Sequence, residues 1–201
     1  MSVSAEQVRS ELLAMAAHDL KVRAKLAADG SLFDGYHPAM ERVHRQHARR
    51  LSALIDTMGW PNALRVGADA AEAAWLIVQH AISCPQLQRR GLALLQVEAA
   101  HGRVDASHVA MLEDRIRVFE GRPQRYGTQF DWDATGMLNP CPIEDPDRVD
   151  DRRSAAGLPP LDEATAQRRQ RADDDGETAP HDPSARAAEF DAWAHRVGWR
   201  S

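Results

Sequence analysis

Three histidines at inward-facing positions are the side chains of this sequence best suited to chemistry. His44 and His47 lie three residues apart in segment 37–58, and His80 ends the apolar run AAWLIVQH. At 100° per residue, His44 and His47 fall within about 60° of the direction of Met40. The apolar residues that share this stripe are Leu51, Leu54, Ile55 and Met58. Imidazole titrates near neutral pH and binds transition metals, so an inward histidine is suited to proton transfer or to metal binding.

The sequence leaves three interpretations of His44 and His47 open. They are a pair satisfied within the fold, a polar substrate-binding pocket, or a metal site. In the metal site, His44, His47, His80 and Asp114 would converge on one ion. The chain has two cysteines without CxxC spacing and carries no zinc signature. The site that we predict therefore contains no metal and no cofactor, with His44 and His47 as substrate-binding residues.

Gln79 and His80 form a second polar pair inside an apolar helix. Adjacent residues on a helix point about 100° apart, so the two side chains face different neighbours. We predict that His80 is the acid–base group, oriented by Asp114 or by a neighbouring amide, and that Gln79 contacts the substrate. The alternative is a core histidine bonded to a backbone carbonyl.

Charged residues also interrupt the apolar pattern of segment 105–120. Asp114 and Arg115 lie between the apolar sectors of this helix, and Arg115 projects near Leu112 and Phe119. A guanidinium that is half-buried needs a carboxylate or carbonyl partners. Arg115 would either hold an anionic ligand or form an internal ion pair that pins the following loop.

That loop, GRPQRYGTQF, gathers amides and hydroxyls on a turn that glycine permits. Tyr126, Thr128 and Gln129 donate and accept hydrogen bonds without charge, which suits recognition of amides, sugars or bases. We predict that they bind a small polar or peptide-like ligand. The alternative is a polar surface turn held down by its aromatic residues.

The elements that position these residues are expected to be helices. Apolar positions recur with helical spacing over 4–28, 37–58, 69–83, 85–101 and 105–120, and short Gly- or Pro-containing connections separate them. We predict an all-α fold, an antiparallel bundle of about five helices with a long irregular loop at 122–146 and a C-terminal docking helix. The predicted domains are a helical domain at 1–171, a flexible linker at 172–183 and an amphipathic segment at 184–201.

Charge and hydropathy narrow the classes of partner. The net charge is −5 with both signs mixed, so no basic patch indicates a nucleic-acid partner. No apolar run approaches the roughly 18 residues of a membrane span. The first residues, MSVSAEQVRS, do not resemble a signal peptide, and we predict a cytoplasmic protein. Two functions stay open: an enzyme, or an immunity-like or regulatory protein that binds a protein partner through the C-terminal segment.

The motifs WLxxQH, ending at His80, and QxYGTQ, ending at Gln129, carry a resemblance to a known family. From about Met40 to Phe130 the chain resembles an uncharacterised, mainly actinobacterial family of bacterial proteins with a domain of unknown function. The resemblance implies a fold type and a site that includes His80, Asp114, Arg115 and residues 126–129, but no reaction. The family pattern more often has Asp and Asn at the positions of His44 and His47, which argues against a shared histidine metal site.

Overall fold

The computed structural model describes residues 4–33 and 35–201, and it is predominantly helical. Helices make up 68% of the chain, and the only sheet within the described residues has two short strands. The all-α prediction is therefore confirmed. By compactness the chain divides into two units, Met1–Val104 and Asp105–Ser201. Within the described ranges, no helix combines the length and apolar character needed to span a bilayer.

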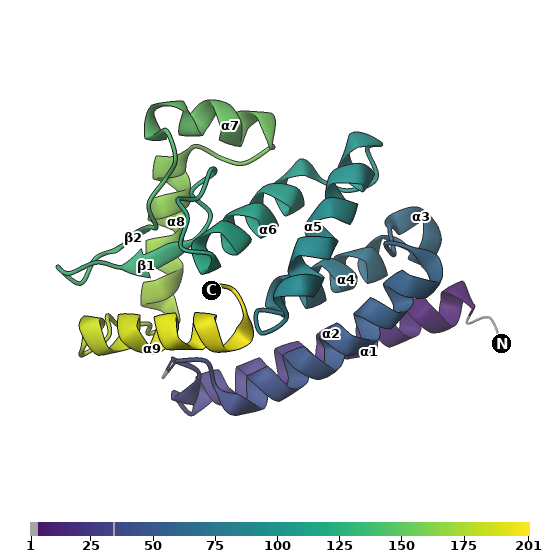
Figure 1. The fold of residues 1–201 in the computed structure, drawn as a ribbon, viewed down its shortest axis with the longest axis horizontal. Coiled ribbons are helices and arrows are strands. Elements are labelled where there is room, and N and C mark those ends of the chain that lie inside the picture. The colour runs from purple at the N-terminus through teal and green to yellow at the C-terminus, as the bar shows by residue number, and fades with distance from the viewer. Residues whose placement is uncertain (1–3, 34) are drawn as a thin grey trace. The chain divides into compact units, whose positions relative to one another are not determined.

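Five helices build the first unit (Figure 1). They are α1 (Ala5–Ala28), α2 (Pro38–Met58), α3 (Ala63–Val66), α4 (Ala68–His80) and α5 (Pro85–Ala100). A single 3₁₀ turn, Ser31–Phe33, follows α1. The short helix α3 lies in a segment that we expected to be a loop. Asn62 caps it by accepting a hydrogen bond from the Arg65 N–H, a side-chain preference that makes a single helical turn stable.

The ends of the first two helices follow the expected chemistry. Ser4 and Gln7 form a reciprocal capping box at the start of α1, with distances of 3.2 and 2.9 Å. Pro38 occupies the first turn of α2, where its missing N–H costs nothing. Gly59 ends α2 with φ of 74°, a conformation that side chains disfavour.

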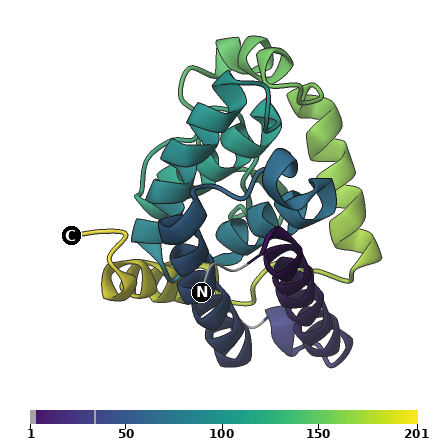
Figure 2. The same ribbon diagram turned by 90° about the vertical axis from the view of Figure 1, so that its right-hand side faces the viewer.

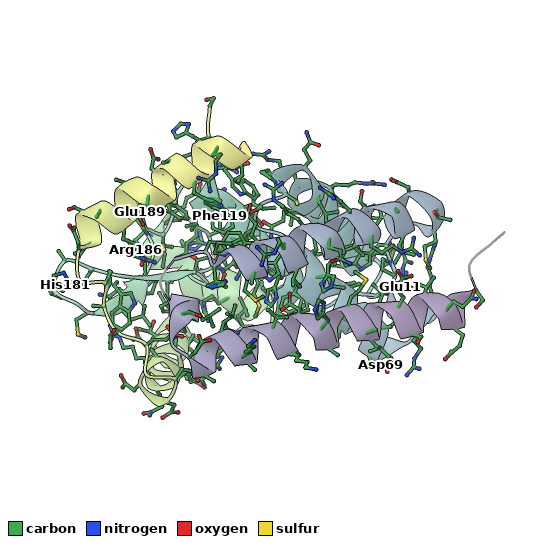
Figure 3. All side chains as sticks on the ribbon, turned by 90° about the horizontal axis from the view of Figure 1, so that it is seen from below. Glu11, Asp69, Phe119, His181, Arg186 and Glu189 are labelled. Atoms are coloured by element: carbon green, nitrogen blue, oxygen red, sulfur yellow. The ribbon has the colours of Figure 1, made fainter. Side chains whose placement is uncertain are left out.

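Helix α4 packs against both α1 and α2 and forms the centre of this unit. Its inward residues Ala70, Ala74 and Val78 are completely buried, so the three helix backbones can approach closely. Ion pairs at the rim join the same helices. The Arg9 Nε lies 3.2 Å from Asp69 Oδ1, and the Arg50 Nη2 lies 2.7 Å from Glu11 Oε2 (Asp69 and Glu11 are labelled in Figure 3).

The inward face of α1 differs from the one that apolar spacing predicts. That spacing assigns Val8, Leu12, Leu13, Ala16 and Leu20 to the inward stripe. In the structure Leu20 is 52% exposed, whereas Asp19 is 1% exposed. At 100° per residue, Asp19 lies about 20° from the direction of Val8, while Leu20 lies about 120° away. The stripe consists of Val8, Leu12, Met15, Asp19 and Leu26. A carboxylate therefore occupies a core position of α1.

The second unit contains four helices and a hairpin (Figure 1). These are α6 (Ala106–Phe119), β1 (Phe130–Trp132), β2 (Leu138–Pro140), α7 (Val149–Ala155), α8 (Leu161–Asp174) and α9 (Pro183–Val197). A 3₁₀ turn, Pro146–Arg148, precedes α7. The antiparallel strands pair Asp131 with Asn139 inside the segment expected to be irregular. Helix α8 continues to Asp174, three residues into the expected linker, because Ala172 is buried.

Helix α9, yellow in Figure 2, docks on the end of α6 through aromatic side chains. The ring of Phe119 lies 5.9 Å from that of Phe190, 5.4 Å from that of Trp193 and 5.3 Å from that of Trp199. Such tilted and edge-to-face ring pairs stabilise beyond the area that they bury. At the other end of α9, Arg186 pairs with Asp131 of β1 (Arg186 is labelled in Figure 3). The C-terminal segment thus forms the docking helix that the sequence predicts.

Candidate functional site

The buried carboxylate of Asp19 lies between two imidazoles in the first unit. Its Oδ1 is 2.9 Å from Nδ1 of His80, and its Oδ2 is 3.0 Å from Nε2 of His44. The three residues come from α1, α2 and α4, the helices that pack together at the centre of the unit. The Asp19 and His44 side chains are 2% and 9% exposed, whereas that of His80 is 25% exposed. This Asp19 cluster, Asp19 with His44 and His80, therefore reaches solvent through His80.

The carboxylate of Asp19 is ionised. Burial alone would raise its pKa, but the contacts with His44 and His80 outweigh burial and hold the pKa well below its usual range. The Nδ1–H of His80 donates to this carboxylate, so Nε2 is the ring nitrogen turned away from Asp19. A carboxylate that fixes the tautomer of a histidine in this way prepares the far nitrogen to accept a proton.

A chain of polar contacts also holds the ring of His44. The Tyr36 hydroxyl lies 2.8 Å from Nδ1 of His44 and is hydrogen-bonded to Ser83, whose own hydroxyl is 3.1 Å from Glu41 Oε1. Burial raises the pKa of Tyr36, which keeps its phenol protonated. With Nδ1 held by Tyr36, Nε2 is the ring nitrogen of His44 that faces Asp19.

His47 lies one turn further along α2, next to His18. Nε2 of His47 is 3.4 Å from Nδ1 of His18, and the two rings meet edge to face. Burial lowers the pKa of His47, so the ring is neutral at neutral pH. His44 and His47 both point inward, as predicted, but they have different partners.

The end of α4 that carries His80 is held by a buried glutamine of α5. The Gln88 amide nitrogen donates to the carbonyls of Val78 and Gln79 at 2.8 and 2.9 Å. Because α4 ends at His80, these carbonyls lack the N–H donors of a further helical turn, and the Ala81 N–H, 3.2 Å from the Val78 oxygen, reaches one of them. Gln79 itself is 4% exposed and His80 is half-buried, so the two adjacent side chains face different surroundings.

Asp19 is the residue of this candidate site that our interpretation of the sequence missed. The spacing 8, 12, 15, 19 continues the apolar stripe of α1 through a carboxylate, and this is the signal that could have found it. Leu13, Ala16 and Leu20 are also apolar and recur with helical spacing. The prediction therefore assigned Leu20, and not Asp19, to the inward face of α1. The carboxylate that contacts His80 is thus that of Asp19.

The carboxylate that the sequence predicted for the site, Asp114, organises the loop of the second unit. It is completely buried and accepts the backbone N–H groups of Arg125, Tyr126 and Thr128 at 2.7, 3.1 and 3.0 Å. The Thr128 hydroxyl adds a fourth donor at 3.0 Å. One aspartate therefore holds the turn of the QxYGTQ motif through charge-assisted hydrogen bonds.

Gln129, a further predicted residue, contributes to the same loop together with Gln124 and Arg153. Gln129 donates its backbone N–H to the buried Gln124 side chain at 2.8 Å and its amide to Thr128 at 3.1 Å. Arg153 of α7, 2% exposed, donates to the carbonyls of Tyr126 and Pro159 at 2.5 and 2.6 Å. Many polar groups of the motif are therefore hydrogen-bonded within the loop itself.

Arg115 also belongs to the second unit, where it is half-buried. Burial lowers the pKa of its guanidinium to about 10, so the side chain still carries its charge at neutral pH. The half-buried position agrees with the expected one, and its role in holding an anion stays a prediction.

Gly127 allows the motif to turn tightly under α8. Its φ is 68°, and a Cβ at this position would lie 2.6 Å from Leu161 Cδ1 and 3.1 Å from Ile143 Cδ1. Gly127→Ala should lower the free energy of unfolding by about 2–3 kcal/mol, from backbone strain plus displacement of these two methyl groups. Gly157→Ala is the matched control, because its φ is 70° and nothing lies within 4 Å of the added Cβ. Urea unfolding that gives equal losses for both variants would contradict this packing argument.

The family model that matches this chain covers residues 6–172, more than four fifths of its length. It is described as a family of unknown function, DUF6624. The chain belongs to DUF6624. The matched part includes the Asp19 cluster, Asp114 and the 124–129 loop, whereas α9 lies outside it. No curated protein and no solved structure matches the chain, so the family itself supplies no reaction.

Proposed function

We propose that this DUF6624 protein is an enzyme that activates water against a small polar or peptide-like substrate at the Asp19 cluster. His80 is the acid–base group and Asp19 orients it. The observation that carries the proposal is a fully buried carboxylate held between two imidazoles, one of which reaches solvent.

The energetic cost of this arrangement supports a functional role. Asp19 occupies a position in the apolar stripe of α1 where a leucine or methionine would pack. Removing a carboxylate from water costs several kcal/mol of solvation free energy. The electrostatic attraction within a buried ion pair rarely exceeds this cost. Groups that cost stability in this way gather at functional sites.

The proton transfers follow from the tautomer of His80. Its Nε2, the nitrogen turned away from Asp19, accepts a proton from water as the water oxygen attacks a substrate carbonyl. The imidazolium that forms is stabilised by the Asp19 carboxylate at 2.9 Å from Nδ1. The same Nε2–H then donates its proton to the departing amine or alcohol, which restores the neutral ring.

The two cysteines do not offer a competing nucleophile. Burial raises the pKa of Cys141 to about 11 and also raises that of Cys84. Both thiols are therefore protonated near neutral pH, and a thiol is a far weaker nucleophile than a thiolate.

His80→Gln should abolish the activity. We expect purified protein to hydrolyse at least one member of a panel of amino-acid p-nitroanilides and p-nitrophenyl esters. The variant should lower kcat/KM by about 100-fold or more, since proton transfer by a positioned side chain contributes about 10²–10⁴-fold. His101→Gln, at an exposed histidine, is the matched control. Equal turnover by both variants, with unchanged circular dichroism, would contradict the role of His80.

A further inference from the structure

We propose that Asp19, His44 and His80 together bind one divalent transition-metal ion, with Zn²⁺ as the first choice. The ligand atoms are a carboxylate oxygen of Asp19, Nε2 of His44 and Nδ1 of His80, and all three lie within 4.8 Å of one another. This inference departs from our expectation of a site without metal.

The spacing of the three atoms is that of ligands around a single ion. Bonds of about 2.1 Å at angles near 90–109° place neighbouring ligand atoms about 3.0–3.4 Å apart. Oδ1 of Asp19 is 2.9 Å from Nδ1 of His80, and Oδ2 is 3.0 Å from Nε2 of His44. One carboxylate oxygen and the two nitrogens lie within 4.8 Å of one another, close enough to converge on one ion.

The buried contact between His44 and Asp19 also suits a cation. Nε2 of His44 is buried without a well-directed hydrogen bond, although Oδ2 of Asp19 is 3.0 Å away. Nδ1 of the same ring is held by Tyr36 at 2.8 Å, so Nε2 is the nitrogen presented to the carboxylate. A divalent cation bound to both Nε2 and the carboxylate would give each of them a partner.

The surroundings of His44 match those of a metal-binding histidine. Such histidines usually donate their second ring N–H to an oxygen, which fixes the ring and strengthens the bound nitrogen as a ligand. Tyr36 supplies that oxygen, 2.8 Å from Nδ1. The ordered chain from His44 to Glu41 thus prepares Nε2 as a ligand in the absence of any ion.

The ligand set selects the class of ion. Two imidazoles and one carboxylate suit zinc and its first-row neighbours, whereas Mg²⁺ and Ca²⁺ prefer oxygen ligands. Three protein ligands leave open positions for water and substrate, the pattern of catalytic zinc sites. His80, 25% exposed, provides the solvent-facing side on which those positions would open.

This inference deepens the proposed function, and only its catalytic consequence rests on that function. Binding of the ion displaces the Nδ1 proton of His80, because a ligand nitrogen must be deprotonated. Water bound to the ion would then lose its proton near neutral pH and attack the substrate in place of water activated by His80. The two forms share the same residues but differ in whether activity survives removal of metal.

The direct test is Co²⁺ binding by full-length, tag-free protein that has been dialysed against EDTA. We expect one Co²⁺ per chain with visible d–d absorption, displacement by Zn²⁺ and no displacement by Mg²⁺ in excess. Asp19→Asn and His80→Gln should each weaken Co²⁺ binding by about 100-fold or more. His101→Gln should leave binding unchanged, and circular dichroism checks that all variants are folded.

Substoichiometric Co²⁺ uptake by folded wild-type protein, or binding that both ligand variants retain, would overturn the metal site. The proposed function fails separately. Hydrolysis that persists in EDTA and depends on His80, without Co²⁺ binding, would contradict the metal site and support the proposed enzyme. Stoichiometric Co²⁺ binding by a protein that hydrolyses no member of the panel would support the metal site and contradict the proposed enzyme.

Discussion

Asp114→Ala should lower the free energy of unfolding by about 3–5 kcal/mol. The side chain is completely buried, and its carboxylate accepts three backbone N–H groups and the Thr128 hydroxyl. Alanine leaves these donors without an acceptor in a place that water does not reach, and each unsatisfied group costs about 1–3 kcal/mol. The donors are fixed by the turn of the backbone, so they cannot rotate toward solvent.

Urea unfolding followed by circular dichroism measures this loss. Thr128→Val is the matched control, because it removes one hydroxyl donor and keeps the backbone N–H of residue 128. The control should cost about 1 kcal/mol. If Asp114→Ala costs no more than Thr128→Val, the carboxylate does not hold the loop and its predicted role at a ligand site gains weight.

Much of the helical architecture could be predicted from local chemistry. The starts of α1 and α2 follow from Ser4 and Pro38, and the inward directions of His44 and His47 follow from helical periodicity alone. These features depend on neighbours within a few residues along the chain. The sequence reports such neighbours directly.

The partner of His80 could not be predicted in the same way. Asp19 and His80 are 61 residues apart, and their contact depends on how α1 packs against α4. Periodicity gives the direction of a side chain but not the helix that it meets. We predicted that Asp114 orients His80 because Asp114 interrupts an apolar pattern. Asp19 interrupts the apolar pattern of α1 in the same way.

The QxYGTQ motif shows a second limit. Its amides and hydroxyls are typical of ligand recognition, yet Gln124 donates to the backbone of its own loop and the Thr128 hydroxyl donates to Asp114 of α6. Each residue other than proline also carries a backbone N–H and a carbonyl group, which need hydrogen-bond partners when they are buried. The one-letter sequence does not show which of these groups a polar side chain will bind. A polar motif beside a buried aspartate therefore deserves an internal interpretation before an external one.

The two buried aspartates should respond to substitution in opposite ways. Asp114 is held by backbone donors that cannot move, whereas Asp19 is held by imidazoles, and His80 is exposed enough to turn toward water. Replacing all partners of a buried ion pair with packed apolar residues is often neutral or stabilising, whereas removing one partner destabilises when it leaves a buried charge uncompensated. An imidazole avoids that cost because it can release its proton near neutral pH. Stability measurements can therefore separate a structural aspartate from a functional one in this chain.

Asp19→Leu should leave the free energy of unfolding unchanged or raise it by as much as about 2 kcal/mol. Leucine extends the stripe formed by Leu12 and Met15, and His44 keeps its hydrogen bond to Tyr36. The same variant should lose Co²⁺ binding and hydrolysis. Urea unfolding measures the first effect, with Asp19→Asn as the isosteric comparison. A loss of more than about 2 kcal/mol would show that the fold requires this carboxylate, and the cost that we attribute to function would instead be a contribution to stability.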